Sequence, residues 1–402
     1  MRSRAGGRVD VRVLLLGFRG ICGPQGGVEA HVETIARELA ALNGSTLSLE
    51  VVERQPYVQR PPAEEAALPI GVRRRPIWSP TSAPFEALVH TLLGVLYAGV
   101  RRPDVLHIHG IGPGLMAPLA RLLGLTVVVT HHGEDYLREK WGWLARAVLR
   151  LGEQCAVRFA HTCIVVNPVV RQRLERRYDT GLCYIPNAAV RLGRESAAAS
   201  SPRAAASRRL IISVGRIVPE KRQLDLIEAF SRIDAPGWRL VLVGGADHQS
   251  DYARSVSAAA SKRPEVVMTG AIDKRAVADH LAQAGLFVLP SSHEGLPIAL
   301  LEAMGMGLPV IVSDIPNLKA LSLPDNCYLP VGDTERLSTA LQKFVDTHPD
   351  GGGGVDWTAH LAPFDVEAVA RATHDVYLAA ANRRRRAGRR PNLGVGVAAE
   401  EH

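Results

Sequence analysis

The sequence predicts an α/β fold in which two doubly wound domains face each other across a cleft. Short apolar runs of the kind found in buried parallel strands alternate with helical patterns along the chain. One stretch without periodicity interrupts this alternation. At 402 residues the chain also exceeds the size at which a single core usually stops growing. These three observations together predict two domains of one architecture.

The first half of the chain contains four apolar runs that predict buried strands. Each run is short and nearly continuous, as in parallel sheets that are covered on both faces. The runs are VRVLLLGF (11–18), VLHIHG (105–110), TVVVTHH (126–132) and TCIVVN (162–167). A strongly apolar helix with a basic end is expected at residues 85–102. We assign residues 1–195 to the N-terminal domain.

A change of composition marks the boundary between the domains. Residues 191–209 are small, polar and basic without periodicity, and we place the linker at 196–209. The second domain spans 210–364, and a helix at 365–382 is expected to pack back toward the first. A disordered basic tail, 383–402, ends the chain. The predicted strands are 210–215, 239–245, 266–270, 286–291 and 308–314, and helices are predicted near 222–233, 250–262 and 273–284.

The composition is that of a globular protein that does not bind nucleic acid. Hydrophobic residues make up 47% of the chain and charged residues 22%. The net charge is +8, but the run RRRRAGRR (383–390) contributes six of these charges, so the folded part is close to neutral. Aromatic residues, which would stack on bases, make up only 5%. We therefore expect small phosphates or an anionic membrane surface as the anions that it meets.

The cysteines and the apolar runs predict a cytoplasmic protein without a membrane span. The five cysteines are odd in number and lack CxxC spacing, which argues against a disulfide framework or a zinc site. The first apolar run ends at Arg19 and is interpreted as a strand rather than a signal sequence. No stretch reaches the roughly 18 apolar residues that a spanning helix needs. Any contact with the inner face of the cell membrane would therefore be peripheral.

The stretch SSHEGLPIALLEAMGMGLPVIVSD, residues 291–314, predicts a phosphate site. It runs from the end of a strand through a loop into a helix, and Pro297 suits the first helical position because its missing donor costs nothing there. Free amides from Gly295 and Leu296 onward would then point out of the helix N-terminus. Such an arrangement attracts phosphate.

Two glutamates stand out in this stretch because the helix carries almost no other charge. Glu294 is expected in the mouth of the loop and Glu302 more than one turn inside the helix, with seven residues between them. Both could reach one extended ligand at different points. Taken singly, Glu294 could also be a solvated loop acid and Glu302 a member of an interhelix ion pair.

A second phosphate-directed feature lies in SVGRIVPEKR, residues 213–222. Gly215 frees the turn after a strand, and Arg216 and Lys221 follow on either side of a proline. Two cations at the carboxyl end of a strand suit a diphosphate, with arginine as a fork and lysine as a point charge. A solvated basic turn is the alternative for this segment alone. Two such features on neighbouring elements favour a shared phosphate site.

A glycine-rich loop follows the first strand. In GFRGICGPQGGVEAHV, residues 17–32, Gly26 and Gly27 permit close approach of a ligand to the backbone. The loop is neither a G-x-G-x-x-G nor a Walker A motif, so nicotinamide or ATP binding is not indicated. HGIGPGL, residues 109–115, lacks the third glycine of the dinucleotide pattern and is set aside.

Polar residues cluster after the strand at 126–132. His132, Glu134 and Asp135 would face the cleft and could orient an acceptor hydroxyl or a sugar ring. A metal site that includes His107 and His109 lacks paired ligand spacing. These two are better interpreted as hydrogen-bonded strand histidines, and no metal is expected.

Together these motifs resemble the retaining glycosyltransferases of family 4, which have the GT-B fold of two Rossmann-like domains. The resemblance covers about residues 11–380. It is carried by GGVEAHV, DVLHIHG, VTHHGEDYLREKWG, YIPNAAV, SVGRIVPEK and EGLPIALLEAMGMGLPVIVSD, of which the last two are specific in combination. It implies a nucleoside-diphosphate sugar as donor, bound by the C-terminal domain, and an acceptor on the N-terminal side.

The family motif also implies roles for individual residues. By this resemblance Glu302 holds the ribose hydroxyls and Glu294 lies beside the donor sugar. Arg216 and Lys221 neutralise the diphosphate, and His132 stabilises the donor sugar or the transition state. Gly215, Gly295, Leu296, Gly26 and Gly27 complete the donor site, and Glu134 and Asp135 lie on the acceptor side. The sequence contains no Asp-x-Asp motif, which implies a metal-independent enzyme without a cofactor.

The implied reaction is hexosyl transfer with retention to a glycan or lipid-linked acceptor, in bacterial surface polysaccharide or glycoconjugate biosynthesis. Two features depart from the family pattern. Ala188 stands where glycine often follows IPN, and EGLP is two residues shorter than the common EGFGLP, which leaves the identity of the sugar open. A catalytically silent sugar-nucleotide-binding protein and a GT-B sugar-nucleotide epimerase are the alternatives.

Overall fold

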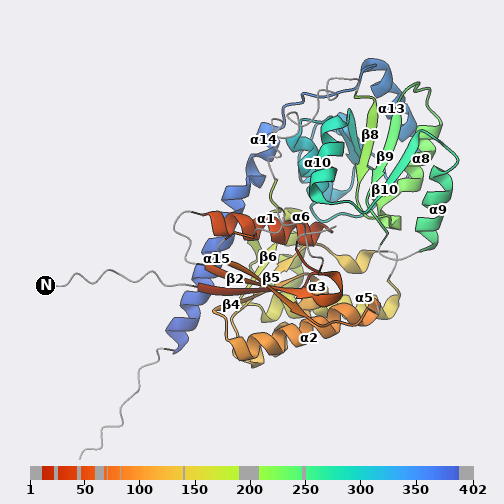
Figure 1. Cartoon of the computed structure of the whole chain (residues 1–402). Coiled ribbons are helices and arrows are strands. Elements are labelled where there is room, and N and C mark those ends of the chain that lie inside the picture. Colours follow the sequence, from red (N-terminus) through yellow and green to blue (C-terminus); the bar gives the residue numbers. More distant parts are fainter. Residues whose placement is uncertain are drawn as a thin grey trace, which may run out of the picture.

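The structure is a computed structural model that describes residues 11–21, 26–42, 47–58, 68–69, 71–81, 83–138, 141–189, 208–246 and 250–388. The described residues form two α/β domains (Figure 1). The predicted linker lies outside the described residues except at its last two positions, and the tail beyond Gly388 lies outside them entirely.

The N-terminal domain is built on a seven-stranded sheet in the order β3-β2-β1-β4-β5-β6-β7. Every pairing between these strands is parallel. The strands are β1 (Val11–Leu16), β2 (Leu47–Arg54), β3 (Val72–Ile77), β4 (Val105–His109), β5 (Val127–His131), β6 (Thr162–Val165) and β7 (Cys183–Tyr184). The strand order reverses between β1 and β4, and open α/β sheets bind ligands beyond the carboxyl ends of the strands at such a point.

Helices cover both faces of this sheet, as continuous apolar strands require. On one face Val13 and Val32 belong to a core shared with the C-terminal helix, and on the other Leu14 packs with Val95 and Leu106. The helical segments are α1 (Gly27–Ala41), η1 (Gln55–Tyr57), α2 (Ala83–Arg101), α3 (Ile111–Gly114), α4 (Ala117–Leu122), η2 (Asp135–Leu137), α5 (Trp143–Phe159) and α6 (Pro168–Tyr178).

The C-terminal domain repeats the architecture on a six-stranded parallel sheet in the order β10-β9-β8-β11-β12-β13. Its strands are β8 (Leu210–Val214), β9 (Arg239–Val243), β10 (Val266–Gly270), β11 (Leu286–Leu289), β12 (Val310–Ser313) and β13 (Tyr328–Leu329). Its helical segments are η4 (Pro219–Lys221), α8 (Gln223–Ser231), α9 (Asp251–Ala260), α10 (Lys274–Gln283), α11 (Ile298–Gly305), α12 (Pro316–Lys319), η5 (Asp325–Cys327), α13 (Thr334–Thr347), α14 (Thr358–Leu361) and η6 (Ala362–Phe364).

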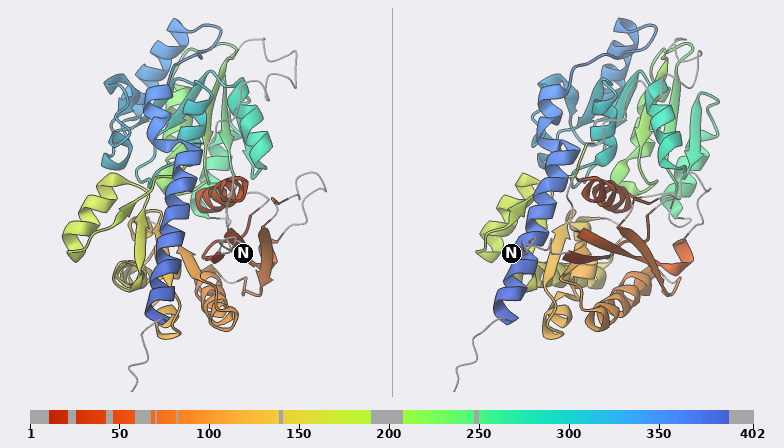
Figure 2. Two further views of the ribbon diagram at one scale, coloured as in Figure 1. Left: turned by 90° about the vertical axis from the view of Figure 1, so that its left-hand side faces the viewer. Right: turned by 60° about the vertical axis from the view of Figure 1, so that its left-hand side comes forward.

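The last helix, α15 (Val366–Gly388), leaves the C-terminal domain and lies along the N-terminal domain (Figure 2). Val369, Ala370 and Tyr377 are buried in the core that α1 and β1 form. The helix runs six residues beyond the predicted end at 382, so residues 383–388 are helical and not part of a disordered tail. Arginine and alanine are strong helix formers, and the Arg384 guanidinium donates to the Pro103 carbonyl.

Candidate donor site between the two domains

Most of the predicted donor residues follow the carboxyl ends of β8 and β11, where the C-terminal domain meets the loop after β5. The contact is close at Gly295: a Cβ atom there would lie 2.1 Å from the His132 carbonyl oxygen. Only a glycine allows the loops of the two domains to approach this far. The structure thus brings a residue predicted for the donor sugar next to the phosphate-directed loop.

Glu294 and Lys221 form an ion pair in this region. Lys221 Nζ lies 2.6 Å from Glu294 Oε1, and the two side chains are 20% and 8% exposed. Lys221 ends the short η4 turn, and Glu294 follows β11. The two motifs that the sequence singled out separately therefore meet in space. An ammonium group has three donors, so a lysine that pairs with one carboxylate can also bind a further anion.

The turn that carries Arg216 is fixed by contacts to neighbouring residues. The Arg216 carbonyl accepts from Gln223 Nε2 at 2.8 Å, and its side chain is half-buried. Gly215 packs against Gly244, where a Cβ atom would lie 2.1 Å from the Gly215 carbonyl oxygen. Gly244 has φ +135°, so a side chain is excluded twice, by space and by backbone conformation. Sequence reasoning missed Gly244, although the pair of glycines that ends β9 signals a close backbone approach.

Three asparagines hold the loop between β11 and α11. Asn167 Nδ2 donates to the Gly295 carbonyl at 2.9 Å, and Asn187 Nδ2 donates to the Leu296 carbonyl at 2.7 Å. Asn317 Nδ2 donates to the Glu294 carbonyl at 2.6 Å. These three hydrogen bonds fix the carbonyl groups of consecutive loop residues, and therefore also the orientation of the peptide amides between them. Sequence reasoning did not name these residues, although Asn167 before a proline is a helix N-cap signal.

Glu302 lies in α11 and is 7% exposed. Burial raises the pKa of its carboxyl group, and the nearby Lys274 ammonium partly offsets this rise. Lys274 Nζ also bonds to Thr34 Oγ1 of α1 at 3.1 Å, so the carboxyl group lies near a contact between the domains. Pro297 is the N-cap of α11 and does not take its first helical position as predicted. A buried acid beside a lysine can bind paired hydroxyl groups such as those of a ribose.

In the N-terminal domain, Gly26 caps α1 and Gly27 begins it. A Cβ atom at Gly27 would meet nothing within 4 Å, whereas one at Gly26 would lie 2.8 Å from Glu29 Oε2. Glu29 Oε1 accepts from the Arg19 amide at 3.0 Å. The space beside Gly27 is therefore open, whereas the Glu29 carboxylate fills the space beside Gly26.

The two acids after β5 have different surroundings. Glu134 is 3% exposed, and its oxygens bind the Tyr136 hydroxyl at 2.7 Å and the Arg173 guanidinium. Both Glu134 oxygens therefore have partners inside the N-terminal domain, and the acceptor-side role of Glu134 stays a prediction. Asp135 is more exposed and pairs with Arg138 at 2.7 Å. Arg138 also lies 3.6 Å from Glu220 of the C-terminal domain.

The histidines of the strand ends also differ from one another. His107 bonds through both ring nitrogens, to the Tyr377 hydroxyl and the Thr130 hydroxyl, each at 2.7 Å. His107 is thus a hydrogen-bonded strand histidine, as the sequence predicted. His109 Nδ1 lies 3.1 Å from His132 Nε2, and its other nitrogen has no partner among the described residues.

Two family models match most of the chain. Residues 25–189 match the model described as Glycosyltransferase Family 4, and residues 208–347 match the model described as Glycosyl transferases group 1. The chain belongs to these glycosyltransferases. The motifs from which the sequence predicted the family lie mainly within the two matched ranges.

Curated relatives of this glycosyltransferase include a Bacillus subtilis protein named as the teichuronic acid biosynthesis glycosyltransferase TuaC. It is 29% identical over 174 residues, 42% of each chain. Glycogen synthase of Mycobacterium tuberculosis is 28% identical over 299 residues, 69% of each chain. An Escherichia coli UDP-Gal:alpha-D-GlcNAc-diphosphoundecaprenol alpha-1,3-galactosyltransferase is 30% identical over 139 residues, 33% of this chain and 35% of that one. The chain spans 42% to 59% of the length of two Bacillus subtilis relatives.

Solved structures of similar architecture cover nearly the whole glycosyltransferase. Sucrose-phosphate synthase from Thermosynechococcus elongatus aligns with a TM-score of 0.74 at 21% identity, over 92% of this chain and 98% of that one. HepE from Anabaena, in complex with UDP and glucose, aligns with a TM-score of 0.69 at 17% identity, over 92% and 100%. These likenesses confirm the predicted GT-B fold.

Proposed function

We propose that this glycosyltransferase moves a hexosyl group from a nucleoside-diphosphate sugar to a hydroxyl acceptor, with retention and without a metal ion. The observation that carries the proposal is the Lys221–Glu294 ion pair. Lys221 lies in the segment after β8 that also carries Arg216, and Glu294 directly precedes Gly295 and Leu296. Cations and loop amides at one edge of a sheet suit a pyrophosphate. The solved structure of HepE, which binds UDP and glucose, supports a donor of this class.

The chemistry requires stabilisation of a departing phosphate. When the bond between the anomeric carbon and the phosphate oxygen breaks, negative charge grows on that oxygen. Lys221 and Arg216 would meet this charge, and preorganised charges of this kind supply a large part of catalysis. The acceptor oxygen then bonds to the anomeric carbon on the same face, and its proton passes to the leaving phosphate. Glu294 and His132 would position the sugar ring, and Glu302 the ribose.

The acceptor is proposed to be a glycan or a lipid-linked glycan in bacterial surface polysaccharide or glycoconjugate synthesis. Relatives named for teichuronic acid synthesis and for transfer to a diphosphoundecaprenol-linked sugar support this class. With Glu134 occupied by Tyr136 and Arg173, Asp135 is the acid that we propose on the acceptor side. Gly26 and Gly27 are proposed to contact the donor through their backbone.

A panel of nucleoside-diphosphate sugars tests the proposal. The wild-type chain should release the nucleoside diphosphate when donor and acceptor are both present, in a chelator as well as without one. Lys221→Ala should lower this rate by about 100-fold or more, because the leaving phosphate loses its point charge. Lys262→Ala, an exposed lysine of the same domain, is the matched control.

The outcomes also separate the alternatives. A catalytically silent binder would show heat of binding but release no diphosphate, and an epimerase would convert the donor without an acceptor. Full activity of Lys221→Ala would contradict the assigned site. Loss of all activity in a chelator would contradict metal independence.

We also propose peripheral contact of α2 with an anionic membrane. Its exposed apolar side chains recur every three or four residues and form one stripe, which consists of Phe85 (57% exposed), Leu88 (38%), Leu92 (36%), Leu96 (46%) and Val100 (83%). The exposed Arg101 and Arg102 follow at its basic end. Within the described part of the chain no helix has the length and apolar character to cross a bilayer. An apolar stripe beside cations suits a helix that lies on anionic lipid.

Sedimentation with anionic phospholipid vesicles measures this contact. Binding is expected at low salt and should weaken at high salt because charge screening removes the electrostatic part. Leu92→Glu should reduce binding, since it places a charge in the stripe, whereas Val331→Glu, on an exposed apolar residue of the other domain, should not. Absence of binding at low salt would remove this part of the proposal.

A further inference from the structure

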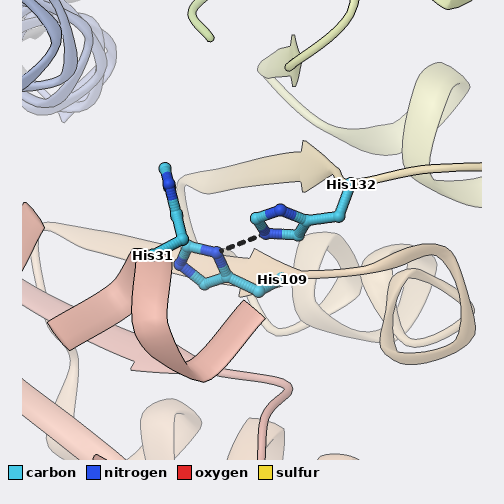
Figure 3. Close-up of side chains that lie close together, drawn as sticks. All are labelled: His31, His109 and His132. Atoms are coloured by element: carbon cyan, nitrogen blue, oxygen red, sulfur yellow. Dashed lines mark hydrogen bonds between the residues drawn. The ribbon is translucent and has the colours of Figure 1, made fainter. Parts of the chain in front are cut away.

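Three histidine rings from separate elements meet at the carboxyl edge of the N-terminal sheet (Figure 3). His31 belongs to α1, His109 ends β4, and His132 follows β5. One ring nitrogen of each lies within 4.8 Å of the other two. His109 Nδ1 and His132 Nε2 are already 3.1 Å apart. Nitrogens bound to one zinc ion at about 2.0–2.1 Å lie about 3.4 Å from one another, so small side-chain rotations would bring all three onto an ion.

Two nitrogens of this cluster lack a hydrogen-bond partner. His31 Nδ1 and His109 Nε2 are buried, and neither has a partner among the residues that the structure describes. The two residues are 7% and 3% exposed, so solvent does not replace the partner. A buried polar atom without a partner costs free energy, so a ligand bound to either nitrogen would remove that cost. The neighbouring His107 differs, since both its nitrogens are bonded.

The protonation state of the rings suits a metal ion. Burial lowers the pKa of His31 to about 4 and holds the pKa of His109 and His132 well below the ordinary value. The rings are therefore neutral near pH 7, and neutral imidazole is the form that binds metal.

We propose that His31, His109 and His132 form a binding site for a divalent transition-metal ion, with Zn²⁺ as the ion that it suits best. Imidazole nitrogens favour zinc, and three protein ligands leave one position of the tetrahedron for water or another ligand. All three rings belong to the N-terminal domain, and only His132 adjoins the phosphate-directed loop, through the contact of its carbonyl with Gly295.

Occupancy of this site would inhibit the enzyme. A ring nitrogen of His132 that binds the ion is no longer available to the donor sugar. This consequence rests on the proposed function, because it depends on the role of His132. Binding of the ion does not rest on it, since the three rings alone determine whether the site exists.

The metal itself is the probe for the site. The full chain is stripped with a chelator and titrated with Co²⁺, followed by visible absorption, and with Zn²⁺, followed by calorimetry. One ion per chain is expected, with the absorption bands of four-coordinate Co²⁺. His31→Asn should weaken binding at least tenfold, because it removes one of three ligands, and His348→Asn, an exposed histidine, should leave it unchanged.

Each outcome decides the proposal. Binding that survives both His31→Asn and His109→Gln, or that is lost in His348→Asn, overturns it, as does the absence of a four-coordinate Co²⁺ spectrum. Circular dichroism establishes whether each variant folds, and His109→Gln serves if His31→Asn does not. In the transfer assay, Zn²⁺ should inhibit the wild type and not His31→Asn. A chain that binds Co²⁺ but transfers no sugar would contradict the proposed function and leave the metal site standing.

Discussion

His90 of α2 is a histidine that is fully removed from water. Its exposed fraction is 0%, and the ring lies near the Glu53 backbone and the Arg54 charge. Burial, with a smaller effect of the Arg54 charge, lowers its pKa to about 4. The unfolded chain has an ordinary histidine pKa near 6.5. Between pH 6.5 and 4 the unfolded state therefore binds more protons than the folded state.

The free energy of unfolding should accordingly fall as the pH drops through this window. His90 alone should cost about 2 kcal/mol at pH 5 relative to pH 7. His90→Leu removes the proton site. In this variant the free energy of unfolding, measured with urea, should differ between pH 7 and pH 5 by about 2 kcal/mol less than in the wild type. His348→Asn is the control at an exposed position. An unchanged difference in His90→Leu would show that the ring does not titrate on unfolding.

Single residues also show which predictions the sequence could support. Glu294 and Lys221 were predicted for one site from two separate motifs, and the structure joins them at 2.6 Å. Glu134 was predicted to face a ligand, but its carboxylate forms an ion pair with Arg173, which lies far along the chain. A motif reports the type of a side chain and its place after a strand. A motif does not show which side chain from a distant part of the chain will contact that residue in the folded protein.

At the scale of an element, the Asn167 side chain both caps helix α6 and donates hydrogen bonds to the C-terminal domain, including the loop between β11 and α11. Its Oδ1 caps α6 by accepting from the Val169 amide at 2.9 Å, and its Nδ2 donates to the carbonyls of Gly295 and Asn317 at 2.9 and 3.0 Å. The cap belongs to the N-terminal domain and the two carbonyls to the C-terminal domain. One side chain thus couples helix stability to loop position.

Asn167→Asp separates these two roles. An aspartate retains the cap, but its second oxygen faces two carbonyl oxygens, so the loop should shift and kcat should fall by about tenfold, or about 1.4 kcal/mol. Asn167→Ala should lose the cap as well and lower the free energy of unfolding by a further amount of about 1 kcal/mol. Steady-state kinetics and urea unfolding of both variants measure this. Equal kcat in Asn167→Asp and wild type would mean that the loop does not need this donor.

The strands differ in how well the sequence predicts them. The runs of β11 and β12 were recognised because both faces of these strands are buried and their apolar residues are continuous. The edge strand β3 has the sequence VRRRPI, with arginines on a strand that pairs on one side only. Charges on an edge strand protect it from unwanted pairing but hide it from a search for apolar runs. Its place in the sheet follows from its partner β2.

At the scale of the whole molecule, the two domains meet through glycine. A Cβ atom at position 295 would lie 2.1 Å from the His132 carbonyl oxygen, a backbone atom of the other domain. This contact and the Arg138–Glu220 pair join the loop after β5 to the C-terminal domain.

Gly295→Ala should therefore separate the domains at the donor site while both cores stay intact. We expect a fall in kcat of about 100-fold, because misplaced reacting groups lose rate steeply. The radius of gyration in small-angle X-ray scattering should increase, with little change in the thermal unfolding midpoint. Gly181→Ala, where a Cβ atom would meet nothing within 4 Å, is the control. Wild-type kinetics in Gly295→Ala would show that this approach is not needed for transfer.

The sequence by itself determined the two α/β domains, the family and the phosphate-directed motifs. Buried strands and the glycine-containing and charged loops that follow them each correspond to a short continuous stretch of sequence. Only the tertiary structure showed that asparagines of both domains donate hydrogen bonds to the β11–α11 loop. It also showed that Arg173 forms an ion pair with Glu134, and that the His31 ring lies beside those of His109 and His132. The physical reason is distance along the chain. These contacts join residues that no local pattern links, so they exist only once the sheets have formed and the domains have met.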